Sequence, residues 1–98
     1  MFEIRLGEQG EVILSGRLDA AQCEKALQFL DGVASPRVMN LGGLDYISSA
    51  GLGVLLKTQK RAMAAGQGLQ LVQVNRHIRD IFRYAGFDKI FQIVPAGE

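Results

Sequence analysis

Two adjacent serines, Ser48 and Ser49, are the residues of this chain whose position best suits chemistry. They stand where a run of apolar residues with helical spacing begins. The first amides of a helix lack intrahelical acceptors and carry partial positive charge, so the start of a helix accommodates an anion. A phosphate on either hydroxyl would bring about −1.5 to −2 charges at pH 7. We therefore expect phosphorylation here to leave the fold intact and to change what the surface binds.

Two glycines, Gly51 and Gly53, contradict the helix predicted at this point. Each costs about 0.5–1 kcal/mol relative to alanine inside a helix. Such a cost suits either the close approach of another backbone or room for a partner or an anion. The simpler interpretation is that the serines cap the helix and the glycines are packing contacts. The segment is not a dinucleotide-binding motif, since Leu56 stands where a third glycine belongs.

A small hydrolase is an alternative from another functional class. Ser49 would be its nucleophile and His77, the only histidine, its base, with Asp19 or Asp80 orienting the imidazole. No oxyanion signature accompanies these residues, so we predict no catalytic residue. The single cysteine, Cys23, excludes an internal disulfide and a multi-cysteine zinc site, and we expect it to be a small buried apolar residue. The sequence indicates neither a metal nor a cofactor.

The composition indicates one folded domain covering residues 1–98. Hydrophobic residues make up 48% of the chain and charged residues 21%, which suits a single core. The formal net charge of +1 gives no electrostatic reason to expect nucleic-acid binding. No apolar run approaches the roughly 20 residues of a membrane span, and the first residues lack a signal-peptide layout. We therefore expect a cytoplasmic protein with neither a membrane nor a nucleic-acid partner.

The spacing of apolar residues alternates between a period of two and one of about 3.6, which predicts strands alternating with helices. The predicted strands are 2–6, one that begins with the apolar run 12–14, 37–41, 69–74 and 90–94. The run 12–14 is typical of a strand covered on both faces. We expect Gly42 and Gly43 to end the third strand.

Three helices are predicted between these strands. Asp19 caps the first, with Gln22 completing a box-like start, and Ser35-Pro36 ends it. The second begins at Ser48 or Ser49, and the third runs from a cap at Asn75 to Gly86. Their apolar stripes should face the core; the stripes are Cys23, Ala26, Leu27 and Leu30, then Leu52, Leu55, Leu56 and Met63, then Ile78, Ile81, Phe82 and Ala85.

The resulting order, β-β-α-β-α-β-α-β, predicts an α/β fold. It is a mostly parallel sheet of about five strands, with an antiparallel N-terminal edge strand and three helices. If the strands lie in sequential order, the loops at their carboxyl ends share one rim, the usual binding edge of an open parallel sheet. That rim would hold Asp19, residues 40–49 and residues 75–77.

The segment from Tyr46 to Leu56, Tyr-Ile-Ser-Ser-Ala-Gly-Leu-Gly-Val-Leu-Leu, resembles the signature of bacterial anti-sigma-factor antagonists. These are single-domain members of the STAS family (sulfate transporter and anti-sigma-factor antagonist). Asn40-Leu41, ahead of this segment, fits the same signature. Gly16-Arg17-Leu18-Asp19 resembles the family's other recurrent stretch, and the predicted strand order matches as well. The resemblance therefore implies a STAS-like β/α superhelix.

The resemblance also implies partner switching without catalytic activity. In that family the unphosphorylated antagonist binds a serine kinase that doubles as an anti-sigma factor. The kinase phosphorylates one serine, the complex dissociates, and a serine phosphatase resets the cycle. The match places the phosphate on Ser49. Many members have aspartate at the preceding position, but here it is Ser48, so two hydroxyls are adjacent and Ser48 is the second choice. It implies a partner-binding surface that contains Asp19, Asn40, Tyr46, Ser48, Gly51 and Leu52.

A constitutive STAS subunit of a transporter-associated or scaffold complex is the alternative from the same fold, with Ser49 as a cap only. Two basic helix faces give weaker signals, and both are expected to be solvated. Lys57, Lys60 and Arg61 share one face beside the switch, where they could steer an acidic partner. The other holds Arg76, Arg79 and Arg83.

Overall fold

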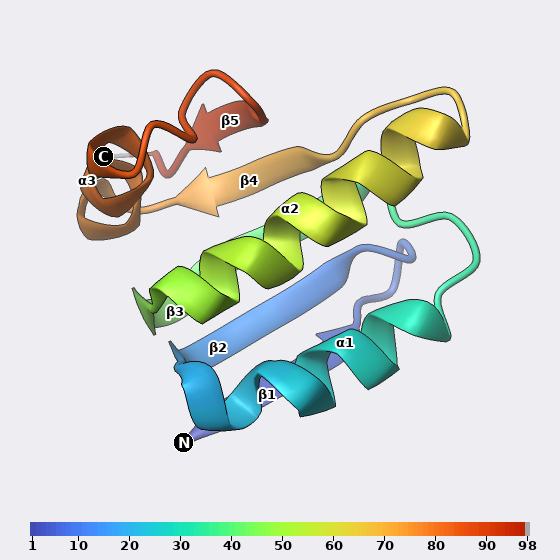
Figure 1. Cartoon of the computed structure of the whole chain (residues 1–98), viewed down its shortest axis with the longest axis horizontal. Coiled ribbons are helices and arrows are strands. Elements are labelled where there is room, and N and C mark those ends of the chain that lie inside the picture. The colour runs from blue at the N-terminus through green and yellow to red at the C-terminus, as the bar shows by residue number, and fades with distance from the viewer. Residues whose placement is uncertain (98) are drawn as a thin grey trace.

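Five strands form one sheet in the order in which they occur in the chain, β1-β2-β3-β4-β5 (Figure 1). The computed structural model describes residues 1–97. Its strands are β1 Phe2–Leu6, β2 Val12–Leu18, β3 Val38–Ile47, β4 Gln70–Val74 and β5 Gln92–Pro95. Its helices are the 3-10 turn η1 Ala20–Gln22, α1 Cys23–Asp31, α2 Ser49–Ala64 and α3 Arg76–Tyr84.

The sheet is antiparallel only between β1 and β2, and every other pair of neighbours is parallel. The five residues between β1 and β2 bring the chain back antiparallel, whereas each later connection passes through a helix. This topology confirms the predicted mostly parallel sheet with an antiparallel N-terminal edge strand. Figure 1 shows both α1 and α2 running along the strands.

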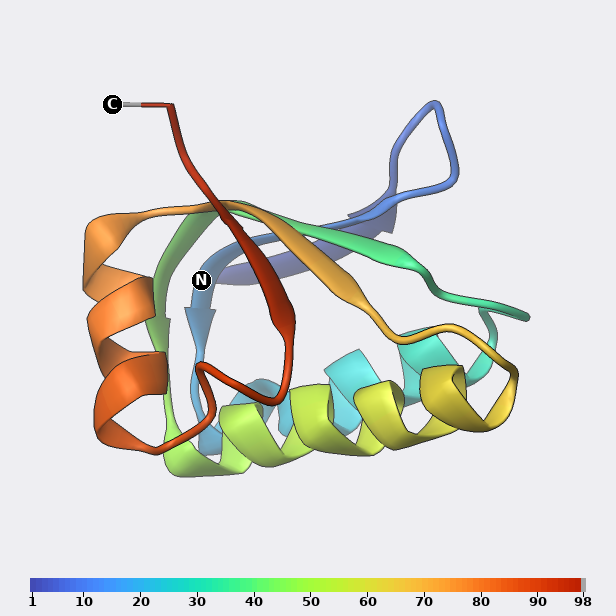
Figure 2. The same cartoon turned by 90° about the horizontal axis from the view of Figure 1, so that it is seen from above.

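The helices cover one face of the sheet. Figure 2 shows α1 and α2 below the strands and α3 at one end of that layer, while in residues 1–97 no helix covers the opposite face. Val12 and Leu14 are therefore buried, and Ile13, which points the other way, is only half-buried. The prediction that this strand is covered on both faces was wrong, because all three crossovers deliver their helices to the same side.

The strand β3 does not end at Gly42 and Gly43, as predicted, but continues to Ile47. The pairing with β2 shifts register twice along this stretch, so the two glycines lie in an irregular part of the ladder that a bulge accommodates. A Cβ on Gly43 would come within 2.9 Å of the Ser15 Cβ on β2. Glycine at this position permits close strand packing and does not break the strand.

The first helix is shorter than predicted. The Asp19 side chain makes no capping hydrogen bond, the chain enters α1 through η1, and α1 ends at Asp31, four residues before Ser35. Ala26 and Leu30 are buried as predicted. Cys23 and Leu27 are half-buried and pack against the core.

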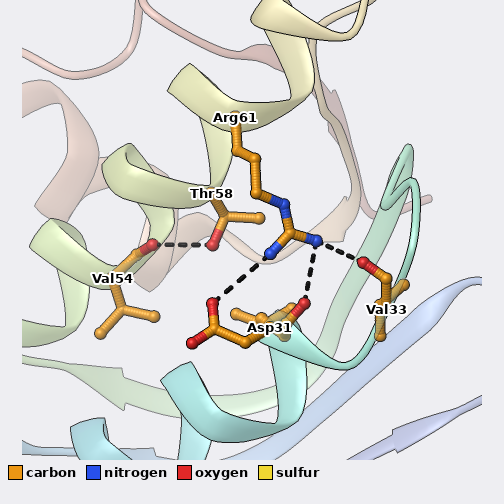
Figure 3. A network of polar contacts seen from close by, with 6 residues as sticks. Asp31, Val33, Val54, Thr58 and Arg61 are labelled. Atoms are coloured by element: carbon orange, nitrogen blue, oxygen red, sulfur yellow. Dashed lines mark hydrogen bonds and ion pairs between the residues drawn. The ribbon is translucent and has the colours of Figure 1, made fainter.

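The early end of α1 is held by an arginine from α2 (Figure 3). Arg61 Nη2 donates to the carbonyl of Leu30 at 2.9 Å and also to the carbonyl of Val33, and Nη1 lies 3.5 Å from the Asp31 carboxylate. Arg61 was predicted to share a solvated face with Lys57 and Lys60, and this prediction was wrong for Arg61. It satisfies carbonyls that a helix end leaves without partners.

The buried face of α2 includes two polar residues that the apolar pattern did not predict. Thr58 and Gln59 are both 4% exposed, whereas Met63, predicted to face inward, is 60% exposed. The Gln59 amide donates to the carbonyl of Ile90 at 2.7 Å and accepts from the Leu69 amide at 2.6 Å. Gln59 thus ties α2 to the chain just before β4 and β5.

The predicted cap of α3 is confirmed. The Asn75 side chain accepts from the Ile78 amide at 2.9 Å and donates to the Leu44 carbonyl at 3.0 Å. Gly86 follows the helix with a φ of +78°, as predicted for a residue after a helix C-terminus. Ala85, predicted to be buried, is exposed. The last strand runs through Pro95, later than the predicted 90–94.

Candidate functional site

The start of α2 is fixed by Ser48, which is its N-cap. The Ser48 hydroxyl accepts a hydrogen bond from the Gly51 amide at 3.1 Å and donates to the Leu18 carbonyl at 3.2 Å. The Ser48 amide donates to the same Leu18 carbonyl at 3.0 Å. These contacts use both the donor and an acceptor position of the half-buried hydroxyl. The end of β2 and the start of α2 are thereby joined.

Ser49 is the first residue of α2 and is exposed. Its hydroxyl forms no hydrogen bond with any residue between 1 and 97. Of the first amides of α2, that of Gly51 is occupied by Ser48. Because Ser49 stands at the start of the helix, the partial positive charge of the helix dipole lies next to its accessible hydroxyl. The two adjacent serines differ in accessibility, and Ser49 is the one that a second protein can reach.

Asp19 lies next to this helix start because it directly follows Leu18, whose carbonyl receives both hydrogen bonds from Ser48. It is half-buried, and its Oδ1 is buried without a hydrogen-bond partner among the described residues. The Asp19 carbonyl accepts from the Cys23 thiol at 3.3 Å. Burial, followed by the charge of Asp19, raises the pKa of Cys23 above its ordinary value of 9.0.

The two glycines of α2 have different surroundings. A Cβ on Gly51 would lie 2.8 Å from both Ile47 Cγ1 and the Leu18 carbonyl oxygen, so Gly51 permits close packing against the sheet. A Cβ on Gly53 would meet nothing within 4 Å, and Gly53 is exposed. The close approach of another backbone therefore occurs at Gly51, whereas no packing contact within the described residues accounts for Gly53.

A groove of about 410 Å³ opens beside Ser49, between the start of α2 and the end of α3. Two of its lining residues, Ile47 and Leu52, are buried, whereas Tyr84 is 87% exposed. Tyr46, the second-to-last residue of β3, reaches the groove and is half-buried, with the Arg17 guanidinium 4.4 Å from the centre of its ring. The lining residues are Tyr46, Ile47, Ser48, Ser49, Leu52, Ile81, Tyr84 and Ala85.

The structure does not bring all of the predicted site residues together. Asn40 lies only two residues into β3, level with Ile13 and Val72, and its side chain accepts from the Gly42 amide at 2.8 Å. Seven residues separate it from Ile47, which is roughly 20 Å along a strand. Asn40 was predicted to share the rim with Ser49, and this placement was wrong because β3 is longer than its sequence pattern suggests.

His77 is exposed on α3, and within the described chain it shares no hydrogen bond with Ser49. The two residues therefore do not form the nucleophile–base pair that a hydrolase would need. The structure also holds no group of three or more His, Cys, Asp or Glu side chains placed to bind a metal ion between residues 1 and 97. In that same range, every helix is too short or too polar to cross a membrane.

The groove contains three residues of α3 and its end that the sequence did not assign to the site, namely Ile81, Tyr84 and Ala85. Ile81 and Ala85 were assigned to the buried stripe of the helix. Half-burial of Ile81 and exposure of Ala85 show that this stripe turns out of the core toward α2. The apolar spacing identified this face of α3, but only the packing of α3 beside α2 shows that the face lines a groove.

Comparison with known proteins identifies the family of this chain. The model of the MlaB-type STAS domain matches residues 3–95. BtrV of Bordetella bronchiseptica, which is named as an anti-sigma factor antagonist, is 36% identical over 87 residues, covering 89% of this chain and 74% of BtrV.

Two solved structures are similar in fold. An anti-sigma factor antagonist from Mycobacterium paratuberculosis superposes with a TM-score of 0.85 at 22% identity, covering 97% of this chain and 86% of its own. The Bacillus cell-fate determinant SpoIIAA in its phosphorylated form superposes with a TM-score of 0.70 at 19% identity, covering 100% and 93%. With a family model spanning residues 3–95 and a relative 36% identical over most of its length, the chain belongs to the STAS domain family and resembles its anti-sigma factor antagonists.

Proposed function

We propose that this protein is a partner-switching regulator. Unphosphorylated, it binds a serine kinase that also acts as an anti-sigma factor; phosphorylation of Ser49 releases it, and a serine phosphatase restores the binding form. The observation that carries this proposal is that the two serines at the start of α2 make different contacts. Ser48 caps the helix through two hydrogen bonds, while the exposed Ser49 hydroxyl has no partner in residues 1–97.

The surroundings of Ser49 suit the docking of another protein. The groove beside it combines an apolar floor with an exposed tyrosine, Tyr84, and Gly53, four residues after Ser49, is exposed and has no side chain. Aromatic residues are enriched where proteins bind one another. Asp19, Tyr46 and Ser48 border this surface, whereas Gly51 and Leu52 support it from below.

A phosphate on Ser49 would disrupt such a contact without disrupting the fold. The dianion would meet the partially positive start of α2, but a docked protein would have to desolvate it beside the carboxylate of Asp19. Emptying a complex from 99% to 1% bound takes about 5.5 kcal/mol of differential affinity. The free-energy cost of burying an unpaired dianion is large enough to supply much of that difference in affinity.

The relatives support the same function. BtrV and the Mycobacterium paratuberculosis protein are both named as anti-sigma factor antagonists. SpoIIAA has been solved in a phosphorylated and in an unphosphorylated form, so this fold accommodates phosphorylation. Asn40, which lies away from the groove, is the weakest member of the proposed contact surface.

The proposal is tested by mixing the purified protein with the serine kinase encoded nearest its gene, with and without ATP. We expect a stable complex without ATP, loss of the complex with ATP, and phosphate on Ser49 by mass spectrometry. Ser49→Ala should bind and stay bound in ATP, and Ser49→Asp should bind at least about tenfold more weakly.

Ser48→Ala is the matched control. It removes the neighbouring hydroxyl and weakens the cap, but it leaves Ser49 available, so ATP should still dissociate the complex. Phosphate on neither serine would refute the switch. A stable complex that is indifferent to ATP would instead identify a constitutive STAS subunit.

A further inference from the structure

We propose that a second groove, between α3 and β5, binds an acidic segment of a partner protein. The groove has a volume of about 510 Å³ and is lined by Arg76, Arg79, Asp80, Arg83, Asp88 and Ile93. Three of these six residues are arginines, and all three come from one helix. Figure 1 shows α3 and β5 at the same end of the molecule.

Two of the arginines are accessible to a ligand. Arg76 and Arg83 are exposed, and they lie two turns apart along α3. Arg83 is paired with Asp80 at 2.7 Å, but its side chain is 66% exposed, and a surface pair of this kind contributes little to stability. A carboxylate from another protein can therefore compete for the Arg83 guanidinium at little cost.

The charge of the whole chain is distributed unevenly in the same direction. Residues 49–98 contain seven basic and three acidic residues, a net charge of +4, whereas residues 1–48 contain four basic and seven acidic residues, a net charge of −3. The overall charge of +1 conceals this difference. The basic half also includes Lys57, Lys60 and Arg61 of α2, so the local attraction for an acidic segment comes from the arginines that line the groove.

The lining favours a peptide segment over nucleic acid. Guanidinium groups pair with carboxylates through two parallel hydrogen bonds, so spaced acidic side chains fit spaced arginines. Asp80 and Asp88 interrupt the positive charge of the groove, so it suits separate acidic side chains placed beside single arginines better than the continuous charge of a phosphate backbone. Ile93 adds an apolar contact that a polypeptide can use and a small anion cannot.

This groove is separate from the site of the proposed switch. The groove beside Ser49 uses Ile81, Tyr84 and Ala85, and the arginine groove uses Arg76, Asp80 and Arg83. The two sets share no residue, so α3 presents one flank to each. Binding in the arginine groove requires no phosphate on Ser49, and its failure would leave the proposed switch unaffected.

The test is a titration of the ¹⁵N-labelled full chain with a capped peptide of about six glutamates, followed by amide chemical shifts. We expect the largest shifts at residues 76–83 and 88–93. The double variant Arg76→Glu with Arg83→Glu should weaken binding about tenfold or more. Raising the salt from about 50 to about 300 mM should weaken binding of the original chain as well.

Lys57→Glu with Lys60→Glu is the matched control, because it reverses two exposed charges on α2 and changes the net charge equally. It should keep the affinity within about twofold. Equal loss in both double variants, shifts centred on α2, or no binding of the peptide would overturn the proposal. Shifts of the same size and position with inorganic phosphate would also overturn it, because they would assign the groove to any anion.

Discussion

Residues 48 to 53 show how side chains that look alike in sequence take different structural roles. Ser48 and Ser49 are chemically identical neighbours, and the contact that separates them is the Leu18 carbonyl, thirty residues earlier in the chain. That carbonyl holds Ser48 and leaves Ser49 at the surface. A helix start with two hydroxyls could be predicted from local spacing, but the choice between them depends on a contact between distant segments.

Gly51 and Gly53 should respond in opposite ways to alanine. Gly51→Ala places a methyl group 2.8 Å from Ile47 and Leu18, so we expect a loss of about 1–3 kcal/mol in the free energy of unfolding despite the better helix propensity. Gly53→Ala meets nothing within 4 Å, so we expect a gain of about 0.5–1 kcal/mol. Urea denaturation of the two variants measures both values.

The same pair also distinguishes a packing role from a docking role. If Gly53 keeps α2 clear for a partner, then Gly53→Ala will be more stable yet bind the kinase less well. A destabilised Gly53→Ala would show that its space is already needed inside the fold. A Gly51→Ala variant as stable as the original chain would contradict the close packing described for Gly51.

At the level of the elements, strands and helices could be identified from sequence, and their ends were harder. The direction of the strands followed from apolar spacing and connection length, whereas their sequential order in the sheet was assumed and agrees with the structure. The end of α1 at Asp31 did not follow from that spacing, because it depends on Arg61 of α2 binding the carbonyls of Leu30 and Val33 (Figure 3). The local signal for this end is Gly32, the C-cap of α1, which the prediction passed over in favour of Ser35-Pro36.

Arg61→Ala should therefore destabilise a helix to which it does not belong. It removes charge-assisted hydrogen bonds to two carbonyls, and we expect a loss of about 1–2 kcal/mol in the free energy of unfolding. Hydrogen exchange should increase most in the last turn of α1. Lys60→Ala, which changes an exposed neighbour, should have an effect within about 0.5 kcal/mol. Equal effects in both variants would rule out a special role for Arg61.

The strand β3 shows the opposite error, an element longer than expected. Glycine pairs are usual strand breakers, but Gly42 and Gly43 lie where the strand changes register and packs closely against Ser15. This extension moves Asn40 away from Ser49, so one misjudged boundary also displaced one member of the predicted site. An error of a few residues in the end of a strand can therefore misplace a predicted site residue by many ångströms.

At the scale of the whole molecule, one layer of helices on one face of the sheet sets what the two sides can do. α1 and α2 share the covered face, and each crossover begins at the carboxyl end of a strand, so it leaves from the rim that holds Ser49 and the groove (Figure 2). The rim could be predicted from strand order, because carboxyl ends of parallel strands meet at one edge. The grooves on either side of α3 could not, because they depend on how that helix packs.

A charge at Ser49 should change binding while leaving the whole fold intact. In Ser49→Asp the carboxylate lies in the first turn of α2, where the dipole favours it by about 0.3–1 kcal/mol, partly offset by Asp19 nearby. We expect the free energy of unfolding to stay within about 1 kcal/mol of the original chain and amide shifts to be confined to the start of α2 and the adjoining groove. Ser48→Ala, which loses the cap, should instead be less stable by about 1 kcal/mol. Urea denaturation and amide spectra of both variants measure these effects. Global unfolding of Ser49→Asp would mean that the negative charge acts by disrupting the fold, and the surface mechanism proposed for the switch would then be wrong.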